Sequence, residues 1–172
     1  DGLVLRVAIN GYGRIGRSVL RAIYESEARQ WVEVVAINEP AELKTIAHLT
    51  RYDSTHGRFP GTVEYEHNRV VVNGDSIRVF HCDNLQNLPW KAHKVDVVLE
   101  CSGTFSDIET AQQHITSGAS RVLFSQPAES TVDATIVYGI NHSYLDGKEK
   151  IISAASCSTN CVVPVIKVLN DA

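Results

Sequence analysis

Cys157 is the residue whose surroundings most suggest covalent chemistry. It lies in the run Ser153-Ala-Ala-Ser-Cys-Ser-Thr-Asn-Cys161, after a short predicted strand and near the start of a predicted helix. Free N–H groups at a helix start favour the thiolate, the nucleophilic form of cysteine. The hydroxyls of Ser156 and Ser158 could hold a phosphate or an oxyanion. Because free cysteines are among the most buried residue types, these residues alone leave a reactive and a buried Cys157 equally open.

Cys161 stands in a more apolar setting than Cys157. Its neighbours at positions 162, 163 and 165 are all valine, so we expect Cys161 to be a core thiol. Pro164 fits comfortably only in the first turn of a helix. The last helix therefore either begins near Asn160 or begins at Cys157 and bends at the proline.

A glycine-rich loop near the start of the chain could bind phosphates. Gly11-Tyr12-Gly13-Arg14-Ile15-Gly16 follows a predicted strand and precedes a predicted helix. In that context the first glycine permits a tight turn, the second lets the backbone approach a pyrophosphate, and the third lets helix and strand pack closely. The pyrophosphate then lies on free N–H groups at the helix N-terminus. The pattern predicts a dinucleotide site, and the alternative is an ordinary strand–helix turn.

The position and charge of Glu39 predict which dinucleotide the site would prefer. It follows the second predicted strand, about 20 residues after the glycine loop. A carboxylate there can accept hydrogen bonds from the adenosine ribose and would repel a 2′-phosphate, which favours NAD over NADP. The alternative is an exposed glutamate with no such role.

Strands and helices alternate along the chain, which predicts an α/β fold of the Rossmann type, doubly wound around a mostly parallel sheet. The alternating run 62–80 breaks at 67–68 and 73–75 and predicts an antiparallel hairpin excursion. We expect Ser106 to cap a helix that Gly118 ends. Apolar runs predict strands over 3–10, 32–37, 95–99, 122–124, 134–138 and 151–152, and apolar periodicity predicts helices up to residue 25, over 43–49, over 106–117 and from 161 to 169.

Composition narrows the classes of function. The chain has 172 residues, about one domain, and a net charge of −4, which argues against a nucleic-acid partner. It has no apolar run of about 20 residues, so we expect no membrane span. The four cysteines, at 82, 101, 157 and 161, fit no metal-site spacing, and we expect no metal, reduced thiols and a cytoplasmic location.

Four segments together resemble the glyceraldehyde-3-phosphate dehydrogenase superfamily. They are Ile9-Asn-Gly-Tyr-Gly-Arg-Ile-Gly-Arg17, Arg51-Tyr-Asp-Ser-Thr-His-Gly57, Glu100-Cys-Ser-Gly-Thr-Phe105 and Ala155-Ser-Cys-Ser-Thr-Asn-Cys161. The resemblance implies an NAD-dependent enzyme that oxidises a small phosphorylated aldose and forms a homotetramer when full length. Cys157 would be the catalytic nucleophile, and Ser156, Cys157 and Ser158 would contact the substrate. The NAD cleft would be lined by Asn10, Gly11, Tyr12, Gly13, Arg14, Ile15, Gly16, Glu39, Ser102, Gly103 and Ser125.

Within that superfamily the chain is more similar to the D-erythrose-4-phosphate dehydrogenases. Ser125-Gln-Pro127, Asp133-Ala-Thr-Ile-Val-Tyr-Gly-Ile-Asn141 and the use of Glu39 in place of Asp carry this similarity. It implies that a thioester on Cys157 is released by water as 4-phosphoerythronate, a precursor of pyridoxal phosphate. In the alternative, a glyceraldehyde-3-phosphate dehydrogenase, inorganic phosphate releases an acyl phosphate. A stand-alone dinucleotide-binding or thiol redox module is the second alternative.

Four positions depart from the family pattern. Tyr12 replaces Phe, Ala154 replaces Asn, Ser158 replaces Thr, and Asp83 stands where Arg is usual beside the adenine. The residue exchanges at Tyr12 and Ser158 are mild, and we expect the one at Asp83 to be tolerated. The loss of Asn at 154 removes a local hydrogen-bonding group.

The resemblance also implies a division of the chain. Residues 1–155 would form the NAD-binding Rossmann domain, and residues 156–172 would carry the nucleophile and the start of a linking helix. The family's general base is a His in a second, catalytic domain, whereas the seven His here match no catalytic motif and are expected on surfaces or in turns. We therefore expect a fragment without the catalytic domain that is inactive alone, with its own oligomeric state left open.

Overall fold

A nine-stranded sheet forms the centre of the fold. The computed structural model describes residues 4–172 of the chain. The predicted strand start at Leu3 lies outside the described residues. β1 (Leu5–Asn10) pairs in parallel with β2 (Val32–Asn38) and with β8 (Val97–Glu100), which confirms the predicted parallel sheet. The order across the sheet is β10 (Ala134–Thr135), β11 (Ile151–Ser153), β9 (Arg121–Phe124), β8, β1, β2, β7 (Asp75–Phe80), β6 (Arg69–Val72) and β5 (Val63–Glu66).

The structure confirms the predicted antiparallel excursion and places it at one edge of this sheet. β5 pairs antiparallel with β6, and β6 pairs antiparallel with β7. His67 and Asn68 turn the chain with positive φ angles of 42° and 60°, and Asn73 and Gly74 do so at the second turn with 50° and 91°. Asn and Gly adopt such angles more readily than other residues. A small separate sheet of β3 (Tyr52–Asp53) and β4 (Gly57–Arg58) was not predicted.

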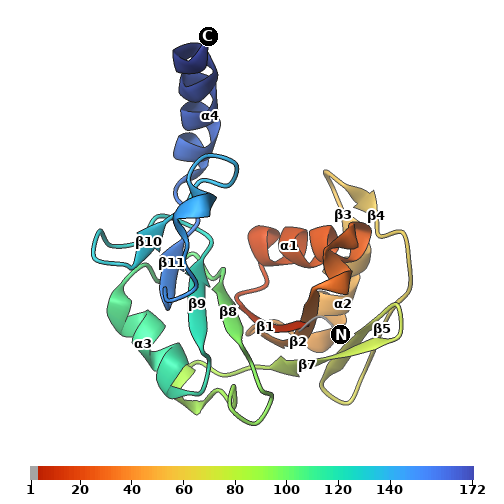
Figure 1. The fold of residues 1–172 in the computed structure, drawn as a ribbon. Helices are drawn as coiled ribbons and strands as arrows, with labels where there is room; N and C mark the ends of the chain where they lie inside the picture. The colour runs from red at the N-terminus through yellow and green to blue at the C-terminus, as the bar shows by residue number, and fades with distance from the viewer. Residues whose placement is uncertain (1–3) are drawn as a thin grey trace.

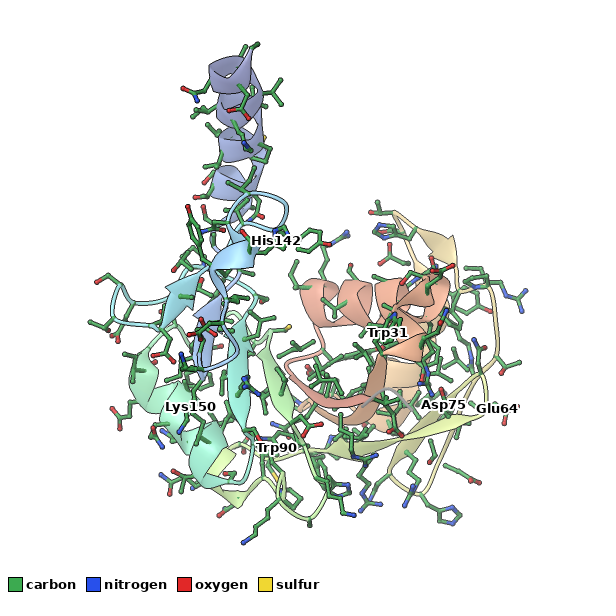
Figure 2. All side chains as sticks on the ribbon, in the orientation of Figure 1. Trp31, Glu64, Asp75, Trp90, His142 and Lys150 are labelled. Carbon is green, nitrogen blue, oxygen red and sulfur yellow. The ribbon has the colours of Figure 1, made fainter. Side chains whose placement is uncertain are left out.

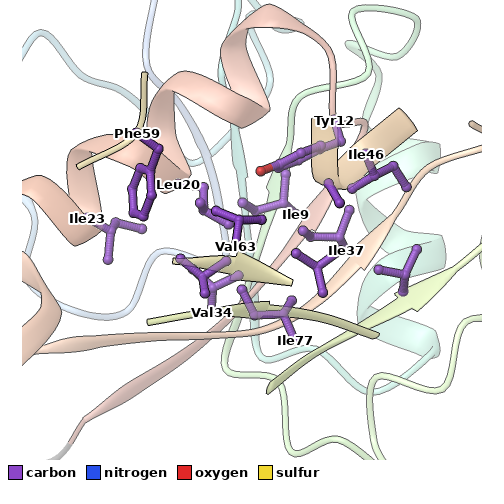
Figure 3. Packing of buried hydrophobic residues seen from close by; sticks show 14 of the residues in the cluster. Ile9, Tyr12, Leu20, Ile23, Val34, Ile37, Ile46, Phe59, Val63 and Ile77 are labelled. Carbon is purple, nitrogen blue, oxygen red and sulfur yellow. The ribbon is translucent and has the colours of Figure 1, made fainter. Parts of the chain in front are cut away.

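Helices cover both faces of the sheet, and because successive strand residues point to opposite faces, neighbouring residues of one strand pack against different helices. Ala8 and Ile9 are adjacent in β1, both fully buried, and belong to two different apolar clusters. Ile9 lies in the cluster beneath α1 (Arg14–Glu25) and α2 (Leu43–Arg51), which Figure 3 shows at close range. Ala8 lies in the cluster that includes Trp90, Phe124 and Ala111 of α3 (Ile108–Thr116). Figure 1 shows α1 and α3 on either side of the central strands.

Several predicted boundaries were wrong in detail. Asp107, not Ser106, caps α3, because its carboxylate accepts a 2.7 Å hydrogen bond from the Thr110 N–H. The strand predicted over 134–138 ends at Thr135, since the Val137 N–H bonds to the Asn141 side chain within the loop. Short 3₁₀ helices, which the sequence did not suggest, span Glu27–Gln30, Leu85–Asn87 and His142–Tyr144.

The last helix, α4 (Cys157–Asp171), begins at the earlier of the two predicted starts and contains Pro164 in its interior. It projects away from the sheet, and its side chains radiate around the helix without a neighbouring element (Figures 1 and 2). The prediction that Cys161 is a core thiol is therefore wrong. Cys161 is exposed, and none of the residues of α4 is buried. Exposed apolar side chains on this helix are Val162, Val165, Ile166, Val168 and Leu169.

Among the described residues, no helix combines the length and the apolar character needed to cross a bilayer.

Candidate cofactor site

The glycine loop joins β1 to α1 at a close approach of two backbones. Gly11 has a φ of +88°, and its N–H donates a 2.9 Å hydrogen bond to the Asn38 carbonyl. A Cβ at Gly11 would lie 2.4 Å from the Ser102 Cα, and one at Gly16 would lie 2.3 Å from the Gly11 carbonyl oxygen. The first and third glycines thus have the steric roles that the motif predicts.

Gly13, the second glycine, faces open space. A Cβ there would have no neighbour within 4 Å, and Gly13 is the N-cap of α1 without a side-chain cap. The first N–H groups of α1 therefore have no capping side chain and can bind an anion. This arrangement fits the pyrophosphate of a dinucleotide, whose approach a side chain at Gly13 would hinder.

The loop lies where the strand order reverses. From β1 the chain proceeds to β2 on one side, whereas the later parallel strands β8, β9 and β11 lie on the other. In open α/β sheets, ligands bind outside the carboxyl ends of the strands at such a switch point. The three strands around it end at one level, since Asn10 is in register with Asn38 of β2 and with Glu100 of β8.

A cavity of about 450 Å³ opens at this switch point. Five of the predicted cofactor residues line it: Asn10, Gly11, Gly13, Glu39 and Ser102. Asp83, the residue that departs from the family pattern, lines it too. Further lining residues, which sequence reasoning missed, are Asn38, Pro40, Cys82, Leu85, Cys101, Thr104 and Phe105.

The other predicted cofactor residues are not among those that line the cavity. Tyr12 is buried in the core, where its hydroxyl lies 2.8 Å from the Thr50 hydroxyl. Arg14 bonds to the Thr55 hydroxyl at 3.2 Å, and Ile15 is half exposed on α1. Ser125 follows β9 and donates its N–H to the Glu100 carbonyl at 3.1 Å, while Gly103 turns the chain after Ser102 with a φ of +73°.

Glu39 is held in place at the end of β2. Its Oε2 accepts a 2.7 Å hydrogen bond from the Tyr12 N–H, and its Oε1 accepts one of 3.3 Å from the Ala41 N–H. A carboxylate offers about four acceptor positions, so two remain for a ligand. The carboxylate therefore has the capacity to bind ribose hydroxyls that the sequence predicts.

Two of the missed lining residues are thiols. Cys82 follows β7 and Cys101 follows β8, so both come from strand ends that meet at this edge. Burial raises the pKa of the Cys101 thiol to about 11. Strand-end positions next to Asn10 could have been found by applying the switch-point rule to every strand, which would have identified Asn38, Cys82 and Cys101.

The thiol segment forms a separate site at the start of α4. Cys157 is exposed and is the first residue of the helix, while Ser156 is the N-cap, accepting a 2.9 Å hydrogen bond from the Thr159 N–H. The Ser156 hydroxyl also lies 3.0 Å from that of Ser158 and 2.6 Å from that of Thr159. Cys157 is not among the residues that line the 450 Å³ cavity.

The side chain of Asn160, in the first turn of α4, is hydrogen-bonded to the backbone that precedes the helix. Its amide donates to the carbonyls of Ala154 and Ser156 at 2.8 and 2.9 Å. Between them, Ala155 adopts a positive φ of 62°, which is unusual for a residue other than glycine or asparagine. Strained backbone is often found at functional sites.

The expectation that every His lies on a surface or in a turn is wrong for His114. It is fully buried in α3 and lies 2.9 Å from the carboxylate of Glu100, which is also buried. Nothing local in the sequence pairs these two residues, since the contact depends on α3 packing over the sheet.

A comparison with protein-family models is consistent with this geometry. A family model described as glyceraldehyde 3-phosphate dehydrogenase, NAD binding domain, matches residues 5–108. That range is more than half of the chain and holds β1, the glycine loop, Glu39 and Ser102. The Rossmann-type fold and NAD as cofactor follow from this match together with the mostly parallel sheet. The chain belongs to the family of glyceraldehyde 3-phosphate dehydrogenase NAD-binding domains.

Proposed function

We propose that this chain is the NAD-binding part of a dehydrogenase that oxidises D-erythrose 4-phosphate to 4-phosphoerythronate through a thioester on Cys157. The observation that carries the proposal is the exposed Cys157 at the N-terminus of α4, surrounded by the hydroxyls of Ser156, Ser158 and Thr159. Similarity of residues 125–127 and 133–141 to the erythrose enzymes supports the choice of substrate.

The residues at the switch point fit NAD. The uncapped start of α1 would bind the pyrophosphate, and the free acceptor positions of Glu39 would bind the ribose hydroxyls. The carboxylate of Glu39 would also repel the 2′-phosphate of NADP. When bound, NAD supplies the acceptor for the hydride that leaves the substrate.

The thiol would carry the covalent chemistry. The Sγ of Cys157 adds to the aldehyde carbon and forms a hemithioacetal, and loss of hydride from that carbon leaves a thioester on the sulfur. Water then cleaves the thioester and releases the acid, while Cys157 regains its thiol. The start of α4 stabilises negative charge on the sulfur and on the attached oxygen. We assign the general base to no His of the described chain.

A phosphorylating glyceraldehyde-3-phosphate dehydrogenase is the second candidate, because the matched family carries that name. The two differ in what releases the thioester. Initial rates of NADH formation by the intact protein should be measured with each aldose phosphate, with and without inorganic phosphate. Turnover of erythrose 4-phosphate that needs no inorganic phosphate supports our proposal. Turnover of glyceraldehyde 3-phosphate that requires inorganic phosphate would establish the second candidate.

The thiol assignment has a matched control one helical turn away. Cys157→Ser should abolish turnover, whereas Cys161→Ser, at the other exposed thiol of the same helix, should retain it. NAD binding without either dehydrogenase activity would favour a stand-alone dinucleotide-binding module instead.

A further inference from the structure

A row of three polar side chains crosses the ends of β2, β1 and β8. The Asn38 amide donates a 2.8 Å hydrogen bond to the Asn10 Oδ1, and the Asn10 amide donates a 2.7 Å hydrogen bond to Oε2 of Glu100. Asn10 and Asn38 line the 450 Å³ cavity, whereas Glu100 is buried and does not line it. The Asn10 side chain is thus held from both sides in one orientation.

The carboxylate of Glu100 is saturated with donors. Oε1 accepts from the Ser102 N–H at 3.0 Å and from the Ser102 hydroxyl at 2.6 Å. Oε2 accepts from Asn10 and from Nε2 of His114, the latter at 2.9 Å. Four donors fill the acceptor positions of a carboxylate. Glu100 therefore fixes two cavity-lining residues, Asn10 and Ser102, while lining none of the cavity itself.

His114 has only one tautomer that satisfies its partners. The indole Nε1–H of Trp90 can only donate, and it lies 3.0 Å from Nδ1 of His114, so this nitrogen must be the acceptor. The proton of the neutral ring is then on Nε2, where it is donated to Glu100. Trp90 therefore donates to His114, and His114 donates to Glu100.

We propose that Glu100 and His114 are positioning residues for NAD, acting through Asn10 and Ser102. Replacing a buried charged network by apolar residues is often neutral or stabilising, so folding alone does not require one here. This network ends on Asn10 and Ser102, which line the cavity, so its function is to hold these two residues in a fixed orientation. The inference rests on the proposed placement of NAD in the 450 Å³ cavity and is independent of which aldose phosphate is oxidised.

Two isosteric variants separate the two hydrogen bonds of His114. The amide of His114→Asn reaches about as far as Nδ1, so it keeps the bond to Trp90 and loses the one to Glu100. The amide of His114→Gln reaches about as far as Nε2 and does the reverse. We expect the Kd of the intact protein for NAD, measured by calorimetry, to rise about tenfold in His114→Asn and less than threefold in His114→Gln.

A stability control distinguishes positioning from general damage. Ile77→Ala removes a fully buried side chain of β7 that does not line the cavity, so its thermal midpoint should fall while its Kd for NAD stays at the wild-type value. If His114→Asn does not fold, the double variant Trp90→Phe/His114→Leu removes both ring hydrogen-bonding groups together, and Oε2 of Glu100 still accepts from Asn10. Its Kd should then rise about tenfold.

Equal Kd values in His114→Asn and His114→Gln would overturn the inference. So would Kd values that simply follow the thermal midpoints, or a wild-type Kd in the double variant. Failure of the wild-type protein to bind NAD would instead overturn the proposed placement of the cofactor, which keeps the two failures distinguishable.

Discussion

The backbone N–H of Tyr12 donates a 2.7 Å hydrogen bond to the carboxylate of Glu39, which ties the glycine loop after β1 to the end of β2. The same carboxylate lines the 450 Å³ cavity. Glu39 therefore holds the loop in place, and in the proposed site it would also present negative charge to the bound nucleotide. Substitutions that remove one role without the other can separate them.

Glu39→Gln should retain the loop contact and lose the charge, because its amide oxygen can still accept from Tyr12. We expect its Kd for NADP to fall at least about tenfold, since the repulsion of the 2′-phosphate is gone. Glu39→Ala also loses the loop contact, and its Kd for NAD should rise about tenfold. Fluorescence titration with both nucleotides measures these constants. An unchanged preference for NAD in Glu39→Gln would show that the charge does not select the cofactor.

Gly11→Ala and Gly13→Ala should fail in different ways. At Gly11 a Cβ would meet the Ser102 Cα at 2.4 Å with φ at +88°, so we expect a loss of about 3 kcal/mol or more in the free energy of unfolding. At Gly13 a Cβ would have no neighbour within 4 Å, and the loss should stay within about 1 kcal/mol.

NAD binding gives the second readout for these glycines. Gly13→Ala should still raise the Kd for NAD, because the new methyl group projects where the backbone must approach the pyrophosphate. Denaturant unfolding and calorimetric titration of both variants provide the comparison. Full NAD affinity in Gly13→Ala would argue that the pyrophosphate does not lie at the start of α1.

The parts of the site that sequence could predict are those encoded by local rules. The steric roles of Gly11 and Gly16 and the position of Glu39 follow from a strand–turn–helix pattern, and the structure has them where expected. His114 was missed because its partners, Glu100 and Trp90, are brought to it only by packing of α3 on the sheet.

Cys161 was placed wrongly for a related reason. Its valine neighbours give α4 an apolar character that usually indicates burial, yet none of the residues of this helix is buried. A run of apolar residues predicts that a helix has a surface suited to packing. It does not predict whether another element of the described chain packs against that surface.

The cysteines should differ in their rates of alkylation. Cys157 and Cys161 are exposed, whereas Cys101 is buried and its pKa is raised to about 11, which leaves little thiolate at neutral pH. We expect iodoacetamide to label Cys157 first, because it is the first residue of α4, then Cys161, and Cys101 last. Peptide mass spectrometry over time gives the order. Labelling of Cys161 ahead of Cys157 would count against an activated thiol at the helix start.

Asp53 should give the fold a specific sensitivity to acid. The backbone N–H groups of His56 and Thr55 donate to its carboxylate and lower its pKa to about 2. Because this pKa is below the unfolded value near 4, the stabilisation is complete above about pH 4 and is lost as the pH falls toward 2. Acid unfolding of Asp53→Asn should lack that part of the pH dependence. Glu64→Gln, at an exposed carboxylate of β5, should retain it.

Tyr12 and Thr50 form a buried hydroxyl pair that a double-mutant cycle can test. Burial raises the pKa of Tyr12 to about 12, so the phenol stays protonated, and its oxygen lies 2.8 Å from that of Thr50. Thr50 also donates to the Ile46 carbonyl within α2, so its hydroxyl remains bonded when Tyr12 is changed to Phe. Tyr12→Phe should therefore cost only about 1 kcal/mol. Thr50→Val leaves the phenol without its partner and should cost about 2 kcal/mol, but clearly less in the Tyr12→Phe background. Strictly additive losses in denaturant unfolding would show that the two hydroxyls do not stabilise one another.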